Sequence, residues 1–577
     1  MINRYFQQEL GHLRDLGAEF SRKHPAVAPM LSGPAADPDV ERLLEGVAFL
    51  TAMLREKLDD EFPEIIHELI HLIWPHYLRP IPCTTIVAFS PKPTLKQPIT
   101  IPAGVEVASV PVEGTSCIFR TCYDVELHPI DLVDAAFVES AGSASSINLV
   151  LELRGSKLAD WEPRTLRLFF AGGYAQAADV YFLLRHHLKE MVITPSEGGR
   201  PVALSPDQLK PVGFAEGENL IPYPGQSLPG YRVLQEYFIL PEKFLFLDIV
   251  GWDRWHERGE GSRFEIRFEL NPGSFEPPRI RKDNFILSAT PAINIFPQDA
   301  DPIRLDHRGT EYPVRPSGSN ASHYQVYSVE EVVGFVQGTA KQRNYVPFEV
   351  FNPQSQDNPV YHVKSRRSPV KTGLDVYLSV AYPPEMHSPV LETLSIELLC
   401  TNGSLPEGLQ VGDISVLTSS SPEFADFRNI LPPTSNVLPP LGSNLLWRLL
   451  SHLSLNYVSL AKAENLVALL ELYVFSETRD RAAVVANRKR IEGIQHVETK
   501  ASNRLVSGIM MRGQDVTVKL RQDHFAGQGD FFLFGSVLDY FLGCYASMNS
   551  YTQFIVEEVL KGDRYQWPVR IGEHFLI

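Results

Sequence analysis

Two histidines and a glutamate near the N-terminus are the residues of this sequence whose spacing best fits a known chemistry. His67, Glu68 and His71 form the pattern His-Glu-x-x-His within a stretch whose apolar spacing predicts a helix. Residues four apart share one face of a helix, so both imidazoles could bind one zinc ion while Glu68 acts as general base on the bound water. With His76 as a candidate third ligand, the pattern raises the hypothesis of a zinc-dependent hydrolase.

The residues around this motif argue against a zinc site. One large class of zinc proteases needs a glycine three residues after the second histidine and a third histidine three residues later, and those positions hold Trp74 and Tyr77. Pro75 ends the predicted helix, and an amphipathic helix over residues 64–74 explains the same side chains without a metal. Neither a phosphate-binding loop with its lysine nor a nucleophilic serine elbow occurs. We therefore expect no catalytic residue, metal or cofactor, and the zinc hydrolase is the less favoured alternative.

Composition excludes several further classes of protein. The 577 residues carry a formal net charge of -16, which argues against nucleic acid as the main partner. A hydrophobic share of 44% excludes wholesale disorder, and 45 prolines with 32 phenylalanines are typical of a β-rich chain with irregular connections. Five scattered cysteines, with no disulfide or zinc-finger spacing, predict a reducing compartment. No secretion signal or membrane-spanning stretch is evident, so we expect a cytoplasmic protein without direct membrane insertion.

Helices are predicted at the start of the chain. Apolar residues recur at three- and four-residue steps from Ile2 to Phe20, which places them on one stripe of a helix. A second apolar stripe runs from Leu43 to Leu58 after the cap-like pair Asp37-Pro38. Pro63 then separates this helix from a third, the one that carries the histidine motif.

Strand-like runs dominate the middle of the sequence. Alternating segments such as 85–89 and 264–270, with prolines and glycines between them, predict antiparallel sandwich or barrel-like units, and 175–187 is the clearest helix among them. Helices mixed with strands return after the proline-rich segment 431–440, beginning with a predicted helix over 444–459. The predicted fold class is α+β and multidomain: an N-terminal helical segment (1–80), a β-rich domain with one helix (81–230), a second β-rich domain (231–438) and a C-terminal α/β domain (439–577).

A series of short segments resembles one protein family along nearly the whole chain. In order they are 1–20, 74–82, 234–246, 289–296, 398–403, 450–457, 511–513, 534–542 and 547–551. This succession is similar to TssF, also called VasA or ImpG, a baseplate subunit of the type VI secretion system. Because the match runs in order from end to end, no single motif has to carry it.

The resemblance implies a structural role. TssF-type chains form the wedge of a phage-tail-like baseplate, in which two copies embrace one TssG chain and bind TssK and TssE. Six such wedges surround the VgrG spike hub and contact one another. The baseplate is the cytoplasmic platform for the tube and sheath, and it docks on the membrane complex at the inner face of the inner membrane. No catalytic residue comes with the family.

Partner contacts are expected on the helices at the two ends of the chain. Aromatic and large apolar side chains anchor protein interfaces more often than other residues do. The candidate interface residues are Tyr5, Phe6, Leu13, Phe20, Trp447 and Tyr457. For each of them, a place in the chain's own core remains the alternative interpretation.

Overall fold

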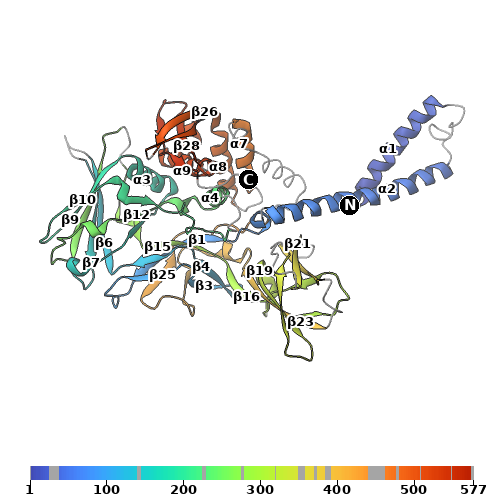
Figure 1. Ribbon diagram of the computed structural model, residues 1–577, viewed down its shortest axis with the longest axis horizontal. Coiled ribbons are helices and arrows are strands. Elements are labelled where there is room, and N and C mark those ends of the chain that lie inside the picture. The colour runs from blue at the N-terminus through green and yellow to red at the C-terminus, as the bar shows by residue number, and fades with distance from the viewer. Residues whose placement is uncertain are drawn as a thin grey trace. The chain divides into compact units, whose positions relative to one another are not determined.

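The computed structural model describes most of the chain: residues 2–24, 38–73, 75–139, 145–223, 229–273, 278–318, 320–348, 358–368, 373–383, 391–439, 462–475, 480–506, 508–546 and 549–572. Residues 2–4, 56–69, 71–73, 75, 76, 321 and 506 are described by their backbone alone. The chain forms two compact units, the N-terminal helices up to Leu78 and the described residues from Arg79 onward. Figure 1 shows helices at the N-terminal end, strands through the middle and a mixture at the C-terminal end, so the predicted fold class is confirmed.

The described residues of the first unit form two helices, α1 (Ile2–Lys23) and α2 (Pro38–Ile73), and a short 3-10 helix, Pro75–Leu78. The prediction of separate helices before and after Pro63 is wrong, because α2 is continuous across that residue. A proline inside a helix lacks one hydrogen bond, but its φ is close to the helical value, and strong helix formers such as leucine, lysine and glutamate flank it here.

The second unit begins with a six-stranded sheet that is nearly closed into a barrel. Asn429, at the end of the last strand, accepts hydrogen bonds from the Gly412 and Ile414 N–H groups and so joins the two edges. Alternate side chains of these strands fill the interior, among them Val87, Phe119 and Phe427. The strands, in sheet order, are β24 (Ile414–Val416), β3 (Glu106–Val112), β4 (Thr115–Thr121), β15 (Ala289–Ile293), β1 (Thr84–Pro91) and β25 (Ala425–Asn429).

Three further sheets adjoin the barrel in sequence. A five-stranded sheet has the order β10 (Val202–Leu204), β9 (Leu188–Pro195), β13 (Arg263–Leu270), β7 (Ser146–Leu153) and β6 (Ile130–Val138). A four-stranded sheet has the order β11 (Leu209–Pro211), β12 (Phe246–Ile249), β8 (Leu166–Phe170) and β14 (Phe285–Leu287). The strands β2 (Ile99–Ile101) and β5 (Val125–Leu127) form a pair of their own.

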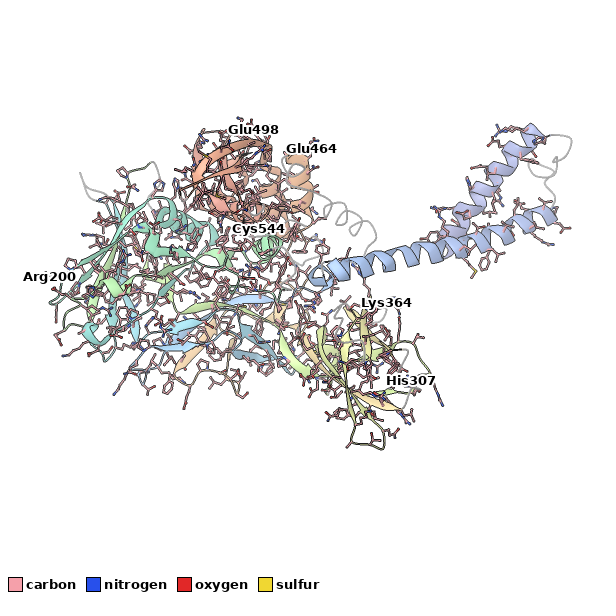
Figure 2. The ribbon with its side chains drawn as sticks, in the orientation of Figure 1. Arg200, His307, Lys364, Glu464, Glu498 and Cys544 are labelled. Atoms are coloured by element: carbon pink, nitrogen blue, oxygen red, sulfur yellow. The ribbon has the colours of Figure 1, made fainter. Side chains whose placement is uncertain are left out.

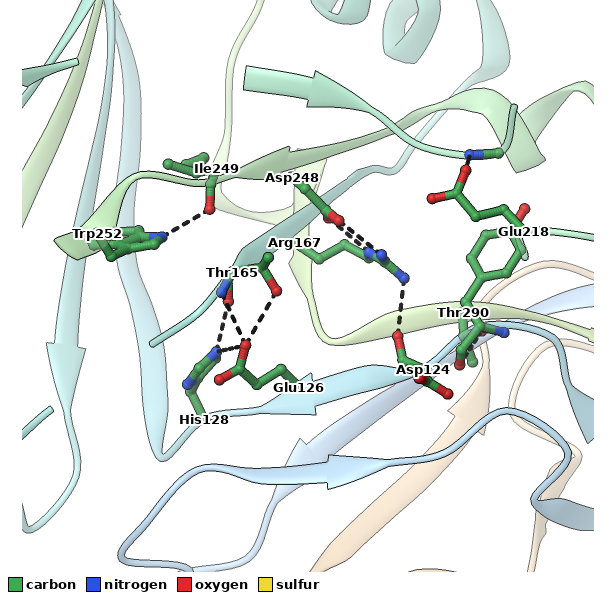
Figure 3. Close-up of polar contacts among 12 residues, drawn as sticks. Asp124, Glu126, His128, Thr165, Arg167, Glu218, Asp248, Ile249, Trp252 and Thr290 are labelled. Atoms are coloured by element: carbon green, nitrogen blue, oxygen red, sulfur yellow. Dashed lines mark hydrogen bonds and ion pairs between the residues drawn. The ribbon is translucent and has the colours of Figure 1, made fainter. Parts of the chain in front are cut away.

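Polar contacts tie the segment around β5 to the four-stranded sheet (Figure 3). Arg167 of β8 binds both carboxylate oxygens of Asp248 on β12, at 2.7 and 2.8 Å, and also donates to the Asp124 carbonyl. The Trp161 indole can only donate, so His128 accepts at Nδ1 and donates from Nε2 to the Thr165 carbonyl. Burial lowers the pKa of His128, which agrees with this neutral form.

A second barrel-like sheet follows in the sequence. Its two edges meet where the Ser317 N–H donates to the Asp299 carbonyl and the Asp301 N–H donates to the Arg315 carbonyl, both at 2.8 Å. In sheet order the strands are β16 (Phe296–Asp299), β23 (Glu392–Thr401), β19 (Gln325–Val336), β20 (Gln342–Pro347), β21 (Val360–Arg367), β22 (Leu374–Ala381) and β18 (Tyr312–Val314), with β17 (Ile303–Leu305) also paired to β23.

The C-terminal part combines a mixed sheet with helices, as predicted. The strands β27 (Ile509–Leu520) and β28 (Ser550–Glu558) are parallel and are connected through α9 (Gln528–Gly543), which forms a βαβ unit. The remaining elements are α7 (Ala463–Glu471), α8 (Arg481–Glu492), β26 (Ile494–Val506), β29 (Arg564–Gln566) and β30 (Arg570–Ile571). The predicted helix over 444–459 lies outside the described residues.

Glycines allow α9 to approach two helices from the middle of the sequence, α3 (Tyr174–His186) and α4 (Pro229–Ile239). A Cβ at Gly529 would lie 2.1 Å from the Ala178 carbonyl carbon in α3, and one at Gly230 would lie 3.0 Å from the Phe541 ring. The Gly529 N–H also donates to the Asp179 carboxylate at 2.7 Å. Close backbone contact at Gly529 therefore fixes the C-terminal elements against α3.

Two buried ion pairs lie among these helices. Arg490 of α8 binds the Asp530 carboxylate at 3.0 Å. Lys243 binds Glu236 of α4, and both side chains are fully buried. Glu236 also accepts from the backbone N–H groups of residues 220 and 221. Burial lowers the pKa of Lys243, and the adjacent Glu236 carboxylate opposes that effect.

We expect Gly529→Ala to destabilise the protein by at least about 2 kcal/mol, because its methyl group would overlap the α3 backbone. The melting temperature measured by differential scanning fluorimetry should fall by several degrees. The matched control is Gly46→Ala on α2, where a Cβ would have no neighbour within 4 Å and where alanine favours the helix by about 0.5–1 kcal/mol. Equal melting temperatures for the two variants would contradict this packing.

We expect Lys243→Met to cost about 3–5 kcal/mol of stability, because Glu236 would remain buried and charged without its partner. Adding Glu236→Gln should recover most of that loss, since a neutral amide oxygen can still accept from the N–H groups of residues 220 and 221. Urea unfolding followed by tryptophan fluorescence measures both variants. A double variant no more stable than Lys243→Met would show that the unpaired charge is not the cause.

Candidate partner interface

One face of α2 packs against α1. Arg55 binds Glu9, and Arg14 binds Glu41 at 2.7 Å, so the two helices are antiparallel. Ala48 and Ala52 are buried. Positions 41, 48, 52 and 55 share one side of a helix, which places both alanines toward α1. Small side chains at this contact let the two helices lie close together.

The opposite face of α2 is apolar and exposed. Leu43, Val47, Leu50 and Leu54 are spaced by four, three and four residues, which is the repeat of a coiled-coil seam. Their exposed fractions are 69%, 41%, 63% and 64%. We call these four residues the leucine seam. Phe49 and Met53, 46% and 47% exposed, widen the same apolar surface.

The chemistry of the leucine seam suits packing against another helix. Four large aliphatic side chains in line form an apolar stripe of the kind that marks an interaction site in a soluble protein. Asp39 and Arg42, at the start of α2, pair with each other at 3.6 Å and are strongly exposed, so this pair gives the surface little net charge. Recognition here would depend on apolar shape and on the 3–4 repeat.

The residues predicted from the sequence occupy different environments. Tyr5, Phe6 and Leu13 of α1 are half-buried, whereas Phe20 is 47% exposed and its ring lies 4.8 Å from that of His24. Trp447 and Tyr457 lie outside the described residues. The apolar stripe of α2 is visible in the sequence but is not among the predicted interface residues, because an amphipathic pattern does not show whether a stripe faces its own chain or a partner.

The histidine motif lies on α2, which is helical up to Ile73 as predicted. The side chains of His67, Glu68, His71 and His76 lie outside the described residues. Within the described part of the chain, no group of three or more histidine, cysteine, aspartate or glutamate side chains is placed to hold a metal ion.

A cavity of about 520 Å³ opens beside the start of α3. Its lining residues are Gly172, Gln176, Arg279, Arg281, Asp283 and Asn284. Of these, Asp283 is the one carboxylate, and the six lining residues include no histidine, cysteine, lysine or tyrosine. The lining therefore offers no acid–base pair, and the apolar surface of α2 is the stronger candidate site.

We expect purified protein to contain well under one zinc ion per chain by inductively coupled plasma mass spectrometry, because Trp74 and Tyr77 hold the positions of the required glycine and third ligand. Glu68→Gln should leave secretion unchanged. Stoichiometric zinc, lost on replacing His67 or His71, would instead support the hydrolase.

The chain is similar to known proteins over almost its full length. The model of the family "Type VI secretion system, TssF" matches residues 1–574. The type VI secretion system component TssF1 of Pseudomonas aeruginosa is 29% identical, and the match covers 98% of each chain. These matches agree with the resemblance found in the sequence.

Two solved structures share this fold. A chain of the TssK-TssF-TssG baseplate subcomplex, solved by cryo-electron microscopy, is 28% identical with a TM-score of 0.75, over 92% of this chain and 99% of that chain. A chain of a type VI secretion baseplate complex is 26% identical with a TM-score of 0.59, over 100% of both chains. None of the helices in the described residues is both long and apolar enough to span a membrane. With a family match from residue 1 to residue 574, the chain belongs to the TssF family of the type VI secretion system.

Proposed function

We propose that this chain is a structural wedge subunit of the type VI secretion baseplate, which assembles with TssG and TssK. The full-length family match and the similarity to a chain of the TssK-TssF-TssG subcomplex support this role. The protein acts as a scaffold and not as an enzyme: it holds other chains in fixed relative positions while the tube and sheath assemble.

The leucine seam is the observation that carries the proposal. A helix of TssG with its own 3–4 apolar repeat packs onto Leu43, Val47, Leu50 and Leu54, and buries side chains that are 41–69% exposed in the chain alone. Tyr5, Phe6, Leu13 and Phe20 of α1 remain proposed contact residues of the same helical unit.

The wider assembly follows the family. Two copies of this chain embrace one TssG, and the wedge also contacts TssE, the VgrG hub and neighbouring wedges, while it meets the sheath and the membrane complex indirectly. Such a baseplate acts in the cytoplasm, docked at the inner face of the inner membrane. Trp447 and Tyr457 remain proposed contact residues, and the four-part domain division remains a proposal as well.

We expect Leu50→Gln/Leu54→Gln to weaken binding of the full-length chain to TssG by at least about tenfold. Burying one leucine contributes about 1.5–3 kcal/mol, and a glutamine amide in its place would be buried without a hydrogen-bond partner. Glutamine favours helix nearly as well as leucine, so α2 should persist. Biolayer interferometry with immobilised TssG measures the dissociation constant.

The matched control is Leu417→Gln/Leu560→Gln, because these leucines are 62% and 60% exposed, close to the 63% and 64% of Leu50 and Leu54. The control should bind TssG as the unaltered chain does. Equal loss in both variants would point to a general effect of lost apolar surface, and no loss in either would remove the leucine seam from the interface.

A further inference from the structure

The hairpin of β26 and β27 extends beyond the rest of its sheet. The two strands pair without a break from His496↔Lys519 to Val506↔Ile509. The neighbouring strand β28 begins only opposite Arg512, so none of the described strands lies beside β27 from Ile509 to Met511. On the other side, β26 is the edge strand of the described sheet. The turn closes through Gly508, whose φ of 82° is a conformation that glycine adopts without strain. Figure 1 shows β26 at the outer side of the C-terminal part.

Polar and aromatic contacts hold the base of this hairpin firmly. Asp515 accepts from Ser502 at 3.0 Å and from Arg504 at 2.9 Å. The Tyr551 hydroxyl of β28 lies 2.6 Å from the Ser502 hydroxyl, and its ring covers Gly513 so closely that a Cβ there would lie 2.4 Å away. The projecting end is therefore carried on a well-anchored base.

The projecting end carries large apolar side chains on both of its faces. Leu505 and Met510 are directly paired, so they share one face, and Ile509 lies on the other. Their exposed fractions are 68%, 69% and 67%. We call these three residues the hairpin tip. A hairpin end that is apolar on one face can be covered by a flat surface of a partner. One that is apolar on both faces is fully covered only when partner side chains contact it from both sides.

We propose that the hairpin tip inserts into a groove on a partner protein chain, walled on both sides by aliphatic or aromatic side chains and carrying a carboxylate at its rim opposite Arg512. This inference rests on the proposed function, since it supposes a subunit that docks with other chains. It adds a second docking surface, at the C-terminal sheet and separate in sequence from the leucine seam.

The charges on the hairpin indicate which group a partner protein carries beside the tip. The Arg512 guanidinium is exposed and makes no hydrogen bond or ion pair with any residue that the structure describes, so it is available for a carboxylate at the rim. The other Lys and Arg side chains of the described hairpin are paired with carboxylates: Lys500 with Glu498 at 2.9 Å, Arg504 with Asp515 at 2.9 Å and Lys519 with Glu557 at 3.9 Å. Figure 2 shows Glu498 at the outer end of the C-terminal part. With one free cation on the described hairpin and a net charge of -16 for the chain, an anionic lipid surface is the poorer match.

The test uses two tip variants of the full-length chain, Leu505→Ser/Met510→Ser for one face and Ile509→Ser for the other. Binding to TssG, and binding of the TssG-bound chain to TssK, are measured by biolayer interferometry. We expect each tip variant to raise the dissociation constant for the same one of these two partners by at least about tenfold. We also expect hydrogen exchange over residues 500–515 to slow when that partner binds.

The control Val559→Ser/Leu560→Ser changes two exposed apolar residues at another turn of the same sheet, 48% and 60% exposed, and should bind normally. Melting temperatures should be unchanged for every variant, because all the altered side chains are exposed. A raised dissociation constant for only one of the two tip variants would overturn the groove with apolar side chains on both sides. Unaltered binding by both tip variants would overturn the inference while the proposed function stands.

Two other binding partners of the hairpin tip, a membrane and a second copy of this chain, are tested as separate arms of the same experiment. Tip-dependent binding to phosphatidylglycerol vesicles without any effect on TssG or TssK would assign the hairpin tip to a membrane. Tip-dependent self-association of the chain alone in sedimentation equilibrium would assign it to a second copy. Either result overturns the proposal, and a wild-type chain that binds neither TssG nor TssK overturns the proposed function together with it.

Discussion

The buried ion pair between Arg490 and Asp530 is the contact on which the attachment of the C-terminal helices to α3 and α4 depends. The Asp530 carboxylate lies in the first turn of α9 and accepts from Arg490, from the Ala526 N–H and from the Tyr174 hydroxyl. Burial by itself would lower the pKa of Arg490, but the nearby Tyr237, Tyr174 and Asp530 raise it above its usual value. Because these groups come from α3, α4, α8 and α9, one carboxylate holds four helices from distant parts of the sequence together.

This arrangement explains why the sheet of the C-terminal part can carry an exposed hairpin tip. The Gly529 contact with α3 and the buried carboxylate of Asp530 fix α9, and α9 connects β27 to β28. The hairpin of β26 and β27 is thereby anchored at its base to the well-packed second unit. An anchored base leaves less conformational entropy to be lost when a partner binds the tip.

The two proposed docking surfaces differ in their physical basis. The leucine seam is one stripe of a long helix whose other face is occupied by α1 through Ala48 and Ala52. It needs a helix of matching repeat, and its strength comes from aliphatic side chains that become buried together. The hairpin tip is small, apolar on both faces and adjacent to the free cation of Arg512, so it needs a groove of defined width. A scaffold subunit gains specificity from two such distinct surfaces, since a wrong partner would have to fit both.

Periodicity determined the helices of the N-terminal segment, the strand-rich middle and the mixed C-terminal part, because the period of apolar residues reports local structure directly. The ordered succession of segments also determined the TssF resemblance, and the neighbours of His67 and His71 counted against a zinc site. Tertiary structure alone decided that α2 continues through Pro63, that its Leu43–Leu54 stripe is left exposed, and that β27 projects beyond β28 to expose Ile509 and Met510. Which apolar face is covered, and where one strand ends beside another, depends on other elements of the chain that pack against it in three dimensions, and no local pattern records those contacts.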